Sequence, residues 1–320
     1  MLIKNSTYKK SKFISGEHLE TVIPSMFRKV KISLTDTERI STPDNDFLDL
    51  DWYKVNSDQL VIISHGLEGS SNSEYVKGMA RVANANNINA LGWNYRGCSD
   101  DMNLTTKFYH SGATYDLRTV ITHAIAKGYA KIALVGFSLG GNLTLKFMGE
   151  LNEYIQPEIK CAVTFSVPID LNSGSNEIQK PKNKMYSLRF LKRLRKKLRA
   201  KHAIMGDRFP LNRVESIKTL REFDNIYTGP LHGFKDANDY YAKSSSLFYL
   251  EKIANPTLIV NAINDPFLPK ECYPYDQLKD HKSVWFETPN HGGHVGFMPA
   301  AKDGSYWSER RALTFIKEYL

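Results

Sequence analysis

The stretch KIALVGFSLGGNLTLKFM, residues 131–148, decides the fold, because it carries a strand into a helix through one sharp turn. Its first part is apolar enough for a strand buried on both faces, and the part after the turn favours a helix. The turn itself is Gly136-Phe137-Ser138-Leu139-Gly140. Its two glycines let neighbouring chain come close, and the N-terminus of a helix favours developing negative charge. The pattern therefore predicts a nucleophilic serine, Ser138, lifted clear of the sheet.

Short apolar strands and helical stretches alternate on both sides of this turn. The expected strands cover residues 59–64, 88–94, 131–136, 159–167, 256–262 and 282–288. The expected helices lie near residues 73–86, 113–127, 139–152, 270–279 and 305–320. Residues 46–55 alternate apolar and acidic side chains, so we expect an antiparallel edge strand with one solvated face there. The alternation predicts an α/β fold with a mostly parallel central sheet flanked by helices.

One connection is too long for this alternation of single strands and single helices. Between Val167 and Pro256 lie 88 residues, whereas a connection in such a fold is usually a few residues plus one helix. We therefore expect a single domain over residues 1–320, with a helical cap inserted at 168–250 before the strand that carries the acid. Residues 1–45 are expected to form an N-terminal extension and edge strand that pack on the core.

A glycine-bearing turn, His65-Gly66-Leu67-Glu68-Gly69, follows the expected strand at 59–64. In folds built around a serine on a strand–helix turn, this position supplies one backbone N–H to the oxyanion, and the residue after the nucleophile supplies the other. We assign these donors to the N–H groups of Leu67 and Leu139. His65 is expected to orient the loop rather than to act as a base.

The general acid–base partners should follow in the order nucleophile, carboxylate, histidine. Asp265 comes directly after the expected strand at 256–262, where a carboxylate can reach a histidine and fix its tautomer. Asp236 and Asp239 are poorer alternatives because they lie within the expected cap. Asp265 is therefore the predicted acid.

Two histidines compete for the role of base. His294 is followed by Val-Gly-Phe, which should bury the far end of its loop, whereas His291 precedes two glycines on a more flexible stretch. His294 is therefore the predicted base. The His-x-x-His spacing could suggest zinc, but it lacks helical register and a third ligand, so no metal is expected.

The charge of the chain is concentrated in one segment. The net charge is +9, and residues 182–201 hold ten Lys or Arg and no acid, so the remainder sums to 9 − 10 = −1. A local helix of this kind does not favour nucleic acid as a partner. Two interpretations stay open: a solvated cap helix, or a helix that touches an anionic membrane. In both, apolar side chains recur at helical spacing beneath the cationic face, at Leu188, Leu191, Leu194 and Leu198.

Other features bear on location. No apolar run approaches the ~20 residues that span a bilayer, and the basic N-terminal stretch lacks the apolar core of a secretory signal. The cysteines are odd in number and far apart, as expected for reduced thiols: Cys98, Cys161 and Cys272. We expect a cytoplasmic protein, with peripheral membrane contact as the alternative that the basic segment leaves open.

Taken together, the motifs resemble the YheT-like branch of the α/β-hydrolases, which also includes yeast medium-chain ester hydrolases/acyltransferases and the lung α/β-hydrolase proteins of animals. The resemblance spans nearly the whole chain and rests on residues 16–21, 65–70, 94–98, 109–117, 136–142, 233–234, 239–241, 264–266 and 292–297. It implies the α/β-hydrolase fold, hydrolysis of carboxylic acyl esters without a cofactor, and the triad Ser138, Asp265 and His294. One departure, Ser99-Asp100 where the family often has another glycine, leaves the triad untouched.

The predicted reaction is two-step acyl transfer from a small-molecule ester of a short- to medium-chain acid or a lipid. Two alternatives remain: an acyltransferase or thioesterase with the same triad, and a non-catalytic lipid- or membrane-binding protein on the same fold. Of the remaining motif residues, Cys98 is expected to be a packed turn residue rather than a second nucleophile. Arg96 is expected to hold a nearby loop through backbone carbonyls.

Overall fold

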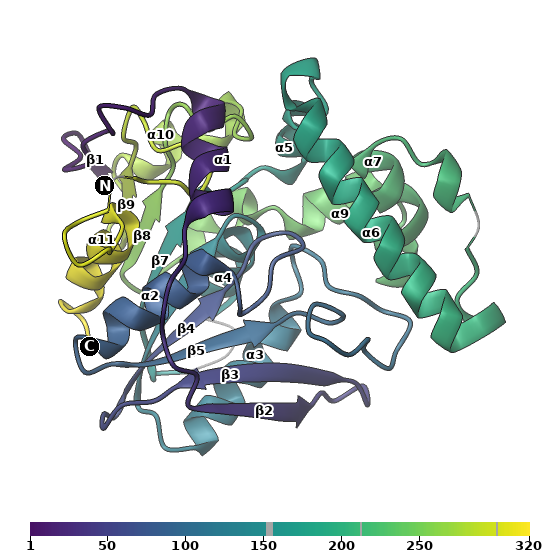
Figure 1. Ribbon diagram of the computed structural model, residues 1–320, viewed down its shortest axis with the longest axis horizontal. Coiled ribbons are helices and arrows are strands. Elements are labelled where there is room, and N and C mark those ends of the chain that lie inside the picture. The colour runs from purple at the N-terminus through teal and green to yellow at the C-terminus, as the bar shows by residue number, and fades with distance from the viewer. Residues whose placement is uncertain (152–155, 212, 299) are drawn as a thin grey trace.

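The computed structural model describes residues 1–151, 156–211, 213–298 and 300–320. Within these residues one nine-stranded sheet crosses the molecule in the order β1-β9-β8-β7-β6-β4-β5-β3-β2 (Figure 1). The strands are β1 Leu2–Ile3, β2 Asp36–Ser41, β3 Phe47–Tyr53, β4 Gln59–Ser64, β5 Asn89–Asn94, β6 Lys131–Phe137, β7 Ile159–Phe165, β8 Thr257–Val260 and β9 Val284–Glu287. The predicted α/β class with a mostly parallel sheet is confirmed.

Neighbouring strands are parallel from β1 to β5 along the sheet, and β3 is antiparallel to both β5 and β2. The antiparallel direction predicted for residues 46–55 is therefore confirmed, but their place at the edge is wrong. The outer side of β3 is covered by β2, where Glu38 pairs with Leu50. Sequence reasoning expected an edge strand within residues 1–45 but gave no bounds for it, because the side chains of β2 are mostly exposed and polar, with only Ile40 buried.

Helices cover both faces of the sheet. The strand residues Leu60 and Ile62 pack with α3, Thr114–Ala126, and α4, Leu139–Glu150. The alternate residues Val61 and Ile63 pack with α2, Glu74–Asn84, and α11, Trp307–Ile316. Because both faces of β4 are buried, its sequence is continuously apolar.

The helix predictions hold with one exception. Helices α2, α3, α4 and α11 lie where the sequence places them, although the last residue of the expected helix 139–152 lies outside the described residues. The helix expected at 270–279 is shorter: a 3-10 turn at Lys270–Cys272 is followed by α10, Tyr275–Leu278. The intervening Pro274 has no N–H to donate and its ring crowds the preceding turn, which disfavours a continuous helix through it.

Between β7 and β8 the chain forms a group of helices beside the sheet, at the right of Figure 1. The largest is α6, Lys184–Met205, and the others are α5 Leu171–Glu177, α7 Leu220–Phe223, α8 Gly229–Leu231 and α9 Ala237–Ser244. Leu191, Leu194 and Leu198 are buried beneath α6, but Leu188 is 52% exposed, so the fourth leucine of the expected stripe faces solvent. Among the described residues, no helix combines the length and apolarity that crossing a membrane requires.

The N-terminal segment reaches both edges of the sheet. Strand β1 pairs with β9 at one edge, and β2 forms the other. Between them α1, Glu17–Phe27, lies in front of the sheet in Figure 1. Two of its side chains, Glu20 and Thr21, are buried. This placement brings the start of the chain to the loop that carries His294.

Candidate active site

Ser138 lies on the sharp turn between β6 and α4. Its backbone has φ 54° and ψ −118°, a conformation that a residue with a side chain rarely adopts. A Cβ on Gly136 would lie 2.4 Å from the carbonyl oxygen of Gly140, and one on Gly140 would lie 2.4 Å from that of Ser64. Only glycine fits at both positions, which explains the spacing that the sequence shows.

The structure brings Ser138, His294 and Asp265 together. The distance from Ser138 Oγ to His294 Nε2 is 2.9 Å, and His294 Nδ1 lies 2.9 and 3.1 Å from the two carboxylate oxygens of Asp265. Because a carboxylate only accepts, Nδ1 must carry the proton, which leaves Nε2 free to accept the serine proton. The Asp265 side chain is fully buried, and its Oδ1 also accepts the N–H of Phe267.

The loop that carries His294 is fixed by α1. Thr21 Oγ1 accepts the backbone N–H of His294 at 2.9 Å, and Glu20 accepts that of Gly292 at 2.7 Å. Glu20 also accepts from the side chain of Asn264, next to the acid. The competing histidine, His291, lies against Glu20 at 3.2 Å rather than near Ser138.

Glu20 and Thr21 were missed as functional residues at the sequence level. They contributed only to the family resemblance, where no role was attached to them. In the structure these two side chains are 2% and 8% exposed, a burial that the sequence alone does not indicate. Buried polar groups of this kind need partners, and here the partners are the backbone of the histidine loop.

The turn after β4 comes close to Ser138. A Cβ on Gly66 would lie 3.3 Å from the Cβ of Ser138. Among the described residues, the N–H groups of Leu67 and Leu139 have no hydrogen-bond partner, as the proposed oxyanion donors require. His65 is fully buried, and burial lowers its pKa to about 3, so the ring is neutral and structural.

Glu68 links this turn to helix α6. It has a positive φ of 54°, and its N–H donates to the hydroxyl of Tyr109. Lys197 of α6 donates to its carboxylate at 2.7 Å, and Arg193 donates to its carbonyl oxygen at 3.1 Å. The residue next to Leu67 is therefore held in place by the helical segment above the site.

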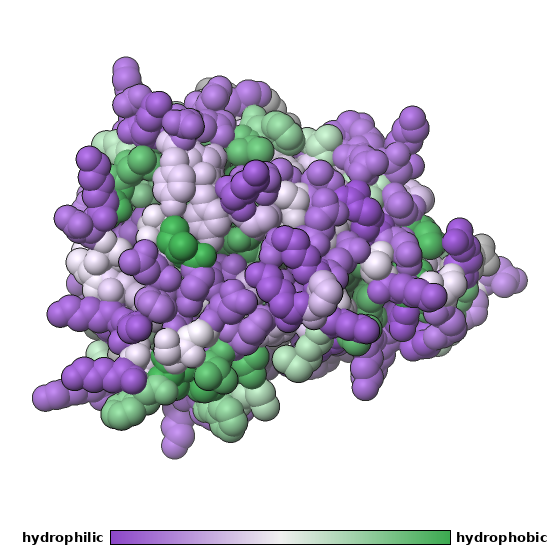
Figure 2. Space-filling view, turned by 90° about the horizontal axis from the view of Figure 1, so that it is seen from above, coloured by the Kyte–Doolittle hydropathy of each residue, from purple (hydrophilic) through white to green (hydrophobic). Residues whose placement is uncertain are grey.

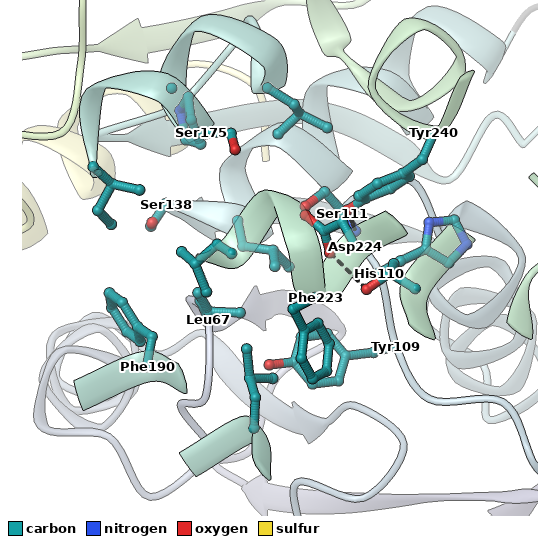
Figure 3. A pocket seen from close by; sticks show the side chains of 18 of the residues that line it. Leu67, Tyr109, His110, Ser111, Ser138, Ser175, Phe190, Phe223, Asp224 and Tyr240 are labelled. Atoms are coloured by element: carbon teal, nitrogen blue, oxygen red, sulfur yellow. Dashed lines mark hydrogen bonds between the residues drawn. The ribbon is translucent and has the colours of Figure 1, made fainter. Parts of the chain in front are cut away.

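Two hollows meet at Ser138. One is a mostly apolar cavity beneath the helical segment, into which Leu67, Phe190 and Phe223 project (Figure 3). The other is a larger cleft between α1 and α6, bordered by Arg189 and Arg193. An ester lying across the serine could therefore place one of its two parts in each hollow.

The contacts of two other residues singled out in the sequence, Arg96 and Cys98, indicate structural roles. Arg96 is buried and binds the carboxylates of Asp44, Asp46 and Asp116, so the expectation that it binds backbone carbonyls is wrong. Its planar fork suits paired carboxylates better than single carbonyls. Cys98 lies 3.1 Å from Lys197 Nζ, and burial raises the pKa of its thiol, which disfavours a nucleophilic thiolate.

The alternative acids lie in the helical segment. Asp236 accepts the N–H of Asp239 at the start of α9, and Asp239 pairs with Lys243 at 2.7 Å. Both are explained by the helix that they begin. Neither has a contact with His294 among the described residues.

Comparisons with known proteins cover most of the chain. A family model described as alpha/beta hydrolase fold matches residues 59–301. The chain is 32% identical to the Escherichia coli protein named "Putative esterase YheT", over 96% of this chain and 92% of that protein. It is 29% identical to the monoacylglycerol lipase of Saccharomyces cerevisiae, over 82% of this chain and 61% of the lipase.

Among solved structures, the Pyrococcus furiosus esterase Pf2001 is similar, with a TM-score of 0.59 and 19% identity over 89% of this chain and 92% of that one. At this identity the similarity shows the shared fold alone. The family model, in contrast, spans the sheet from β4 onward, including the serine turn and the histidine loop. The chain therefore belongs to the α/β-hydrolase fold family, in the branch that contains YheT.

Proposed function

We propose that the chain is a carboxylic ester hydrolase in which Ser138 is the nucleophile, His294 the general base and Asp265 the acid. The observation that carries the proposal is the unbroken hydrogen-bonded series from the serine hydroxyl through the imidazole to a buried carboxylate. The names of its relatives, an esterase and a monoacylglycerol lipase, support the same reaction class.

The mechanism follows from the geometry. His294 Nε2 takes the proton of Ser138 as the hydroxyl oxygen attacks the ester carbonyl, and Asp265 stabilises the imidazolium that forms. The N–H groups of Leu67 and Leu139 stabilise the oxyanion. The imidazolium then protonates the leaving alcohol, and water attacks the acyl-enzyme in the second step.

Each of the two hollows can hold one of the two parts of the ester, the acyl chain or the alcohol. We propose that residues 168–250 act as a cap and that the acyl chain lies in the apolar cavity beneath it, while the alcohol leaves through the larger cleft between α1 and α6. The cavity volume is about 160 Å³. This is close to the ~150 Å³ cavity that holds one benzene molecule, so an acyl chain of roughly six carbons fits.

A peripheral membrane contact is a second part of the proposal. Lys197 and Lys201 of helix α6 point inward, but six other basic side chains of this helix are exposed: Lys184, Arg189, Lys192, Arg193, Lys196 and Arg199. Met185 and Leu188 of the same helix are 65% and 52% exposed. Figure 2 shows hydrophobic side chains in small groups among hydrophilic ones on the upper face. Basic and apolar side chains together suit an anionic lipid surface. Binding to such a surface would place lipid esters near the cleft between α1 and α6.

Hydrolysis of p-nitrophenyl esters from two to twelve carbons by the wild type and by Ser138→Ala tests the proposal. We expect a preference for short to medium chains and a loss of about a million-fold on removing the nucleophile. Ser33→Ala, which changes an exposed serine outside the site, should keep wild-type turnover. Turnover by Ser138→Ala close to that of the wild type would overturn the assignment.

A further inference from the structure

The apolar cavity beneath the helical cap contains one carboxyl group that the proposed mechanism does not use. Asp224 lines this cavity, and Figure 3 shows it on the side away from Ser138, close to Ser111 and Tyr240. It begins η5, Asp224–Thr228, a single π-helical turn. Such turns are rare and often occur at functional sites, because the extra residue aims a side chain where an α-helix would not.

Asp224 is held by hydroxyl groups rather than by a cation. Thr228 Oγ1 donates to one carboxylate oxygen at 2.6 Å, and the hydroxyl of Tyr241 donates to the other at 2.7 Å. Among the described residues no lysine, arginine or histidine forms an ion pair with it. The nearby Arg221 donates instead to the side-chain oxygens of three asparagines: Asn172, Asn176 and Asn238.

This arrangement leaves acceptor capacity facing the cavity. A carboxylate offers about four acceptor positions, and two of them are taken by the hydroxyls of Thr228 and Tyr241. Burial raises the pKa of Asp224 to about 6 despite the opposing effects of the two hydroxyls and of the nearby Arg221, so the charged form is less stable here than in water. A carboxyl placed in an apolar cavity without a counter-ion costs stability, and a ligand that donates to it would offset that cost.

We propose that the cavity binds an acyl chain carrying a hydroxyl group distant from the ester carbon, and that this hydroxyl donates to Asp224. This inference rests on the proposed ester hydrolase function, because it assumes that the chain enters from Ser138. The cavity walls between Ser138 and Asp224 suit a hydrocarbon chain, since apolar side chains project into the space (Figure 3): Leu67, Phe190 and Phe223.

A hydroxyl fits this position better than an ammonium group. Lys197 also lines the cavity and is already paired with Glu68, so an ammonium group would add an unbalanced second cation to a mostly apolar space. An ammonium ion would in addition lose its hydration for a single carboxylate that already accepts two hydrogen bonds. A hydroxyl group loses less hydration free energy on entering the cavity. It would join a group of hydroxyls that already includes Thr228, Tyr241 and Ser175.

A purely structural role is the competing explanation. Asp224 connects η5 to α9 through Tyr241, and that connection alone could account for the residue. The two explanations differ in what a change at Asp224 does. A structural role predicts a change in stability with equal effects on all substrates, whereas the proposed role predicts a change in the preference between substrates.

The test compares p-nitrophenyl esters of ω-hydroxyalkanoic and plain alkanoic acids with six, seven and eight carbons, matched in chain length. For the wild type we expect kcat/KM to favour the hydroxylated ester by about 10-fold or more at one chain length, as a hydrogen bond to a charged group supplies. Asp224→Leu should lose this preference. Asp224→Asn keeps the shape and one acceptor, so it should fold normally and lose part of the preference.

The control is Asp207→Asn, which removes an exposed acid from the same helical segment and should keep the wild-type ratio. The matched ω-amino esters form a further arm, and their preference over the hydroxylated esters would overturn the choice of a hydroxyl. Equal use of hydroxylated and plain esters by the wild type, or an unchanged ratio in both Asp224 variants, would overturn the inference. Absence of hydrolysis of every ester would instead refute the function on which it rests.

Discussion

The catalytic edge of the sheet and the helical segment above it are built by different means. At the edge, Ser138 follows directly after β6 and Asp265 lies on the loop after β8, and the backbone conformation places each side chain. In the helical segment, the side chains that reach the site come from the middle of helices, and a few buried polar contacts set their position, as with Lys197 and Glu68. Changes at the edge should therefore abolish chemistry, and changes in the helical segment should alter rate or selectivity.

Among variants that keep the nucleophile Ser138, the largest effect should come from Asp265→Asn. The amide would keep the space filled but would favour the wrong tautomer of His294, so we expect kcat to fall by about 10⁴-fold. The matched control is Asp239→Asn, which removes an acid of the helical segment paired only with its own helix and should keep kcat within a few-fold. Similar losses in the two variants would remove the contrast between the regions.

A smaller loss should follow from Thr21→Val, because the N–H of His294 would lose its acceptor. Since a misplacement near 1 Å can cost about 100-fold, we expect kcat to fall by about 10- to 100-fold with KM nearly unchanged. Thr21→Ser keeps the hydroxyl and should restore most of the activity. If valine and serine gave equal rates, α1 would not position the histidine.

Short motifs at the edge could be predicted from the sequence because their chemistry demands particular residues. Glycine is required on both sides of Ser138 because an added Cβ would lie 2.4 Å from a carbonyl oxygen. The order of the catalytic residues along the chain led to the prediction of Asp265 and His294. The contributions of Glu20 and Asp224 could not be predicted. Glu20 contacts a loop far away in the sequence, and the contacts of Asp224 depend on a π-helical turn that the sequence pattern does not reveal.

The same limit explains the wrong expectations. Ten basic residues at 182–201 suggested one cationic face, yet Lys201 is fully buried and donates to the carbonyl oxygens of Asn103 and Thr105. Helical spacing indicates which residues share a face, but it does not indicate which neighbours that face will meet. For the same reason the edge position of 46–55 could not be judged without β2.

In the helical segment, Lys197→Met should reduce kcat by about tenfold. The change leaves the buried carboxylate of Glu68 without its cation, which loosens the turn that holds the N–H of Leu67, and a lost oxyanion donor costs about 100-fold or more. Lys196→Met, the exposed neighbour on the same helix, serves as the control and should match the wild type. Equal rates for the two variants would show that α6 does not hold the oxyanion turn.

The smallest effect on chemistry should come from neutralising exposed cations of α6. Replacing Lys184, Lys192 and Lys196 by glutamine should leave turnover of soluble esters unchanged, because none of these side chains contacts the triad or lines either hollow. Binding to vesicles that contain phosphatidylserine should fall and should be weakened by salt in the wild type. Unchanged sedimentation with vesicles would refute the membrane contact.

The most direct test of the central claim is covalent labelling with a fluorophosphonate probe, followed by mass spectrometry of the labelled peptide. The hydrogen-bonded series from Ser138 to Asp265 predicts a single label on Ser138, with labelling strongly slowed in His294→Ala. A label on another residue, or an equal labelling rate in His294→Ala, would contradict the account.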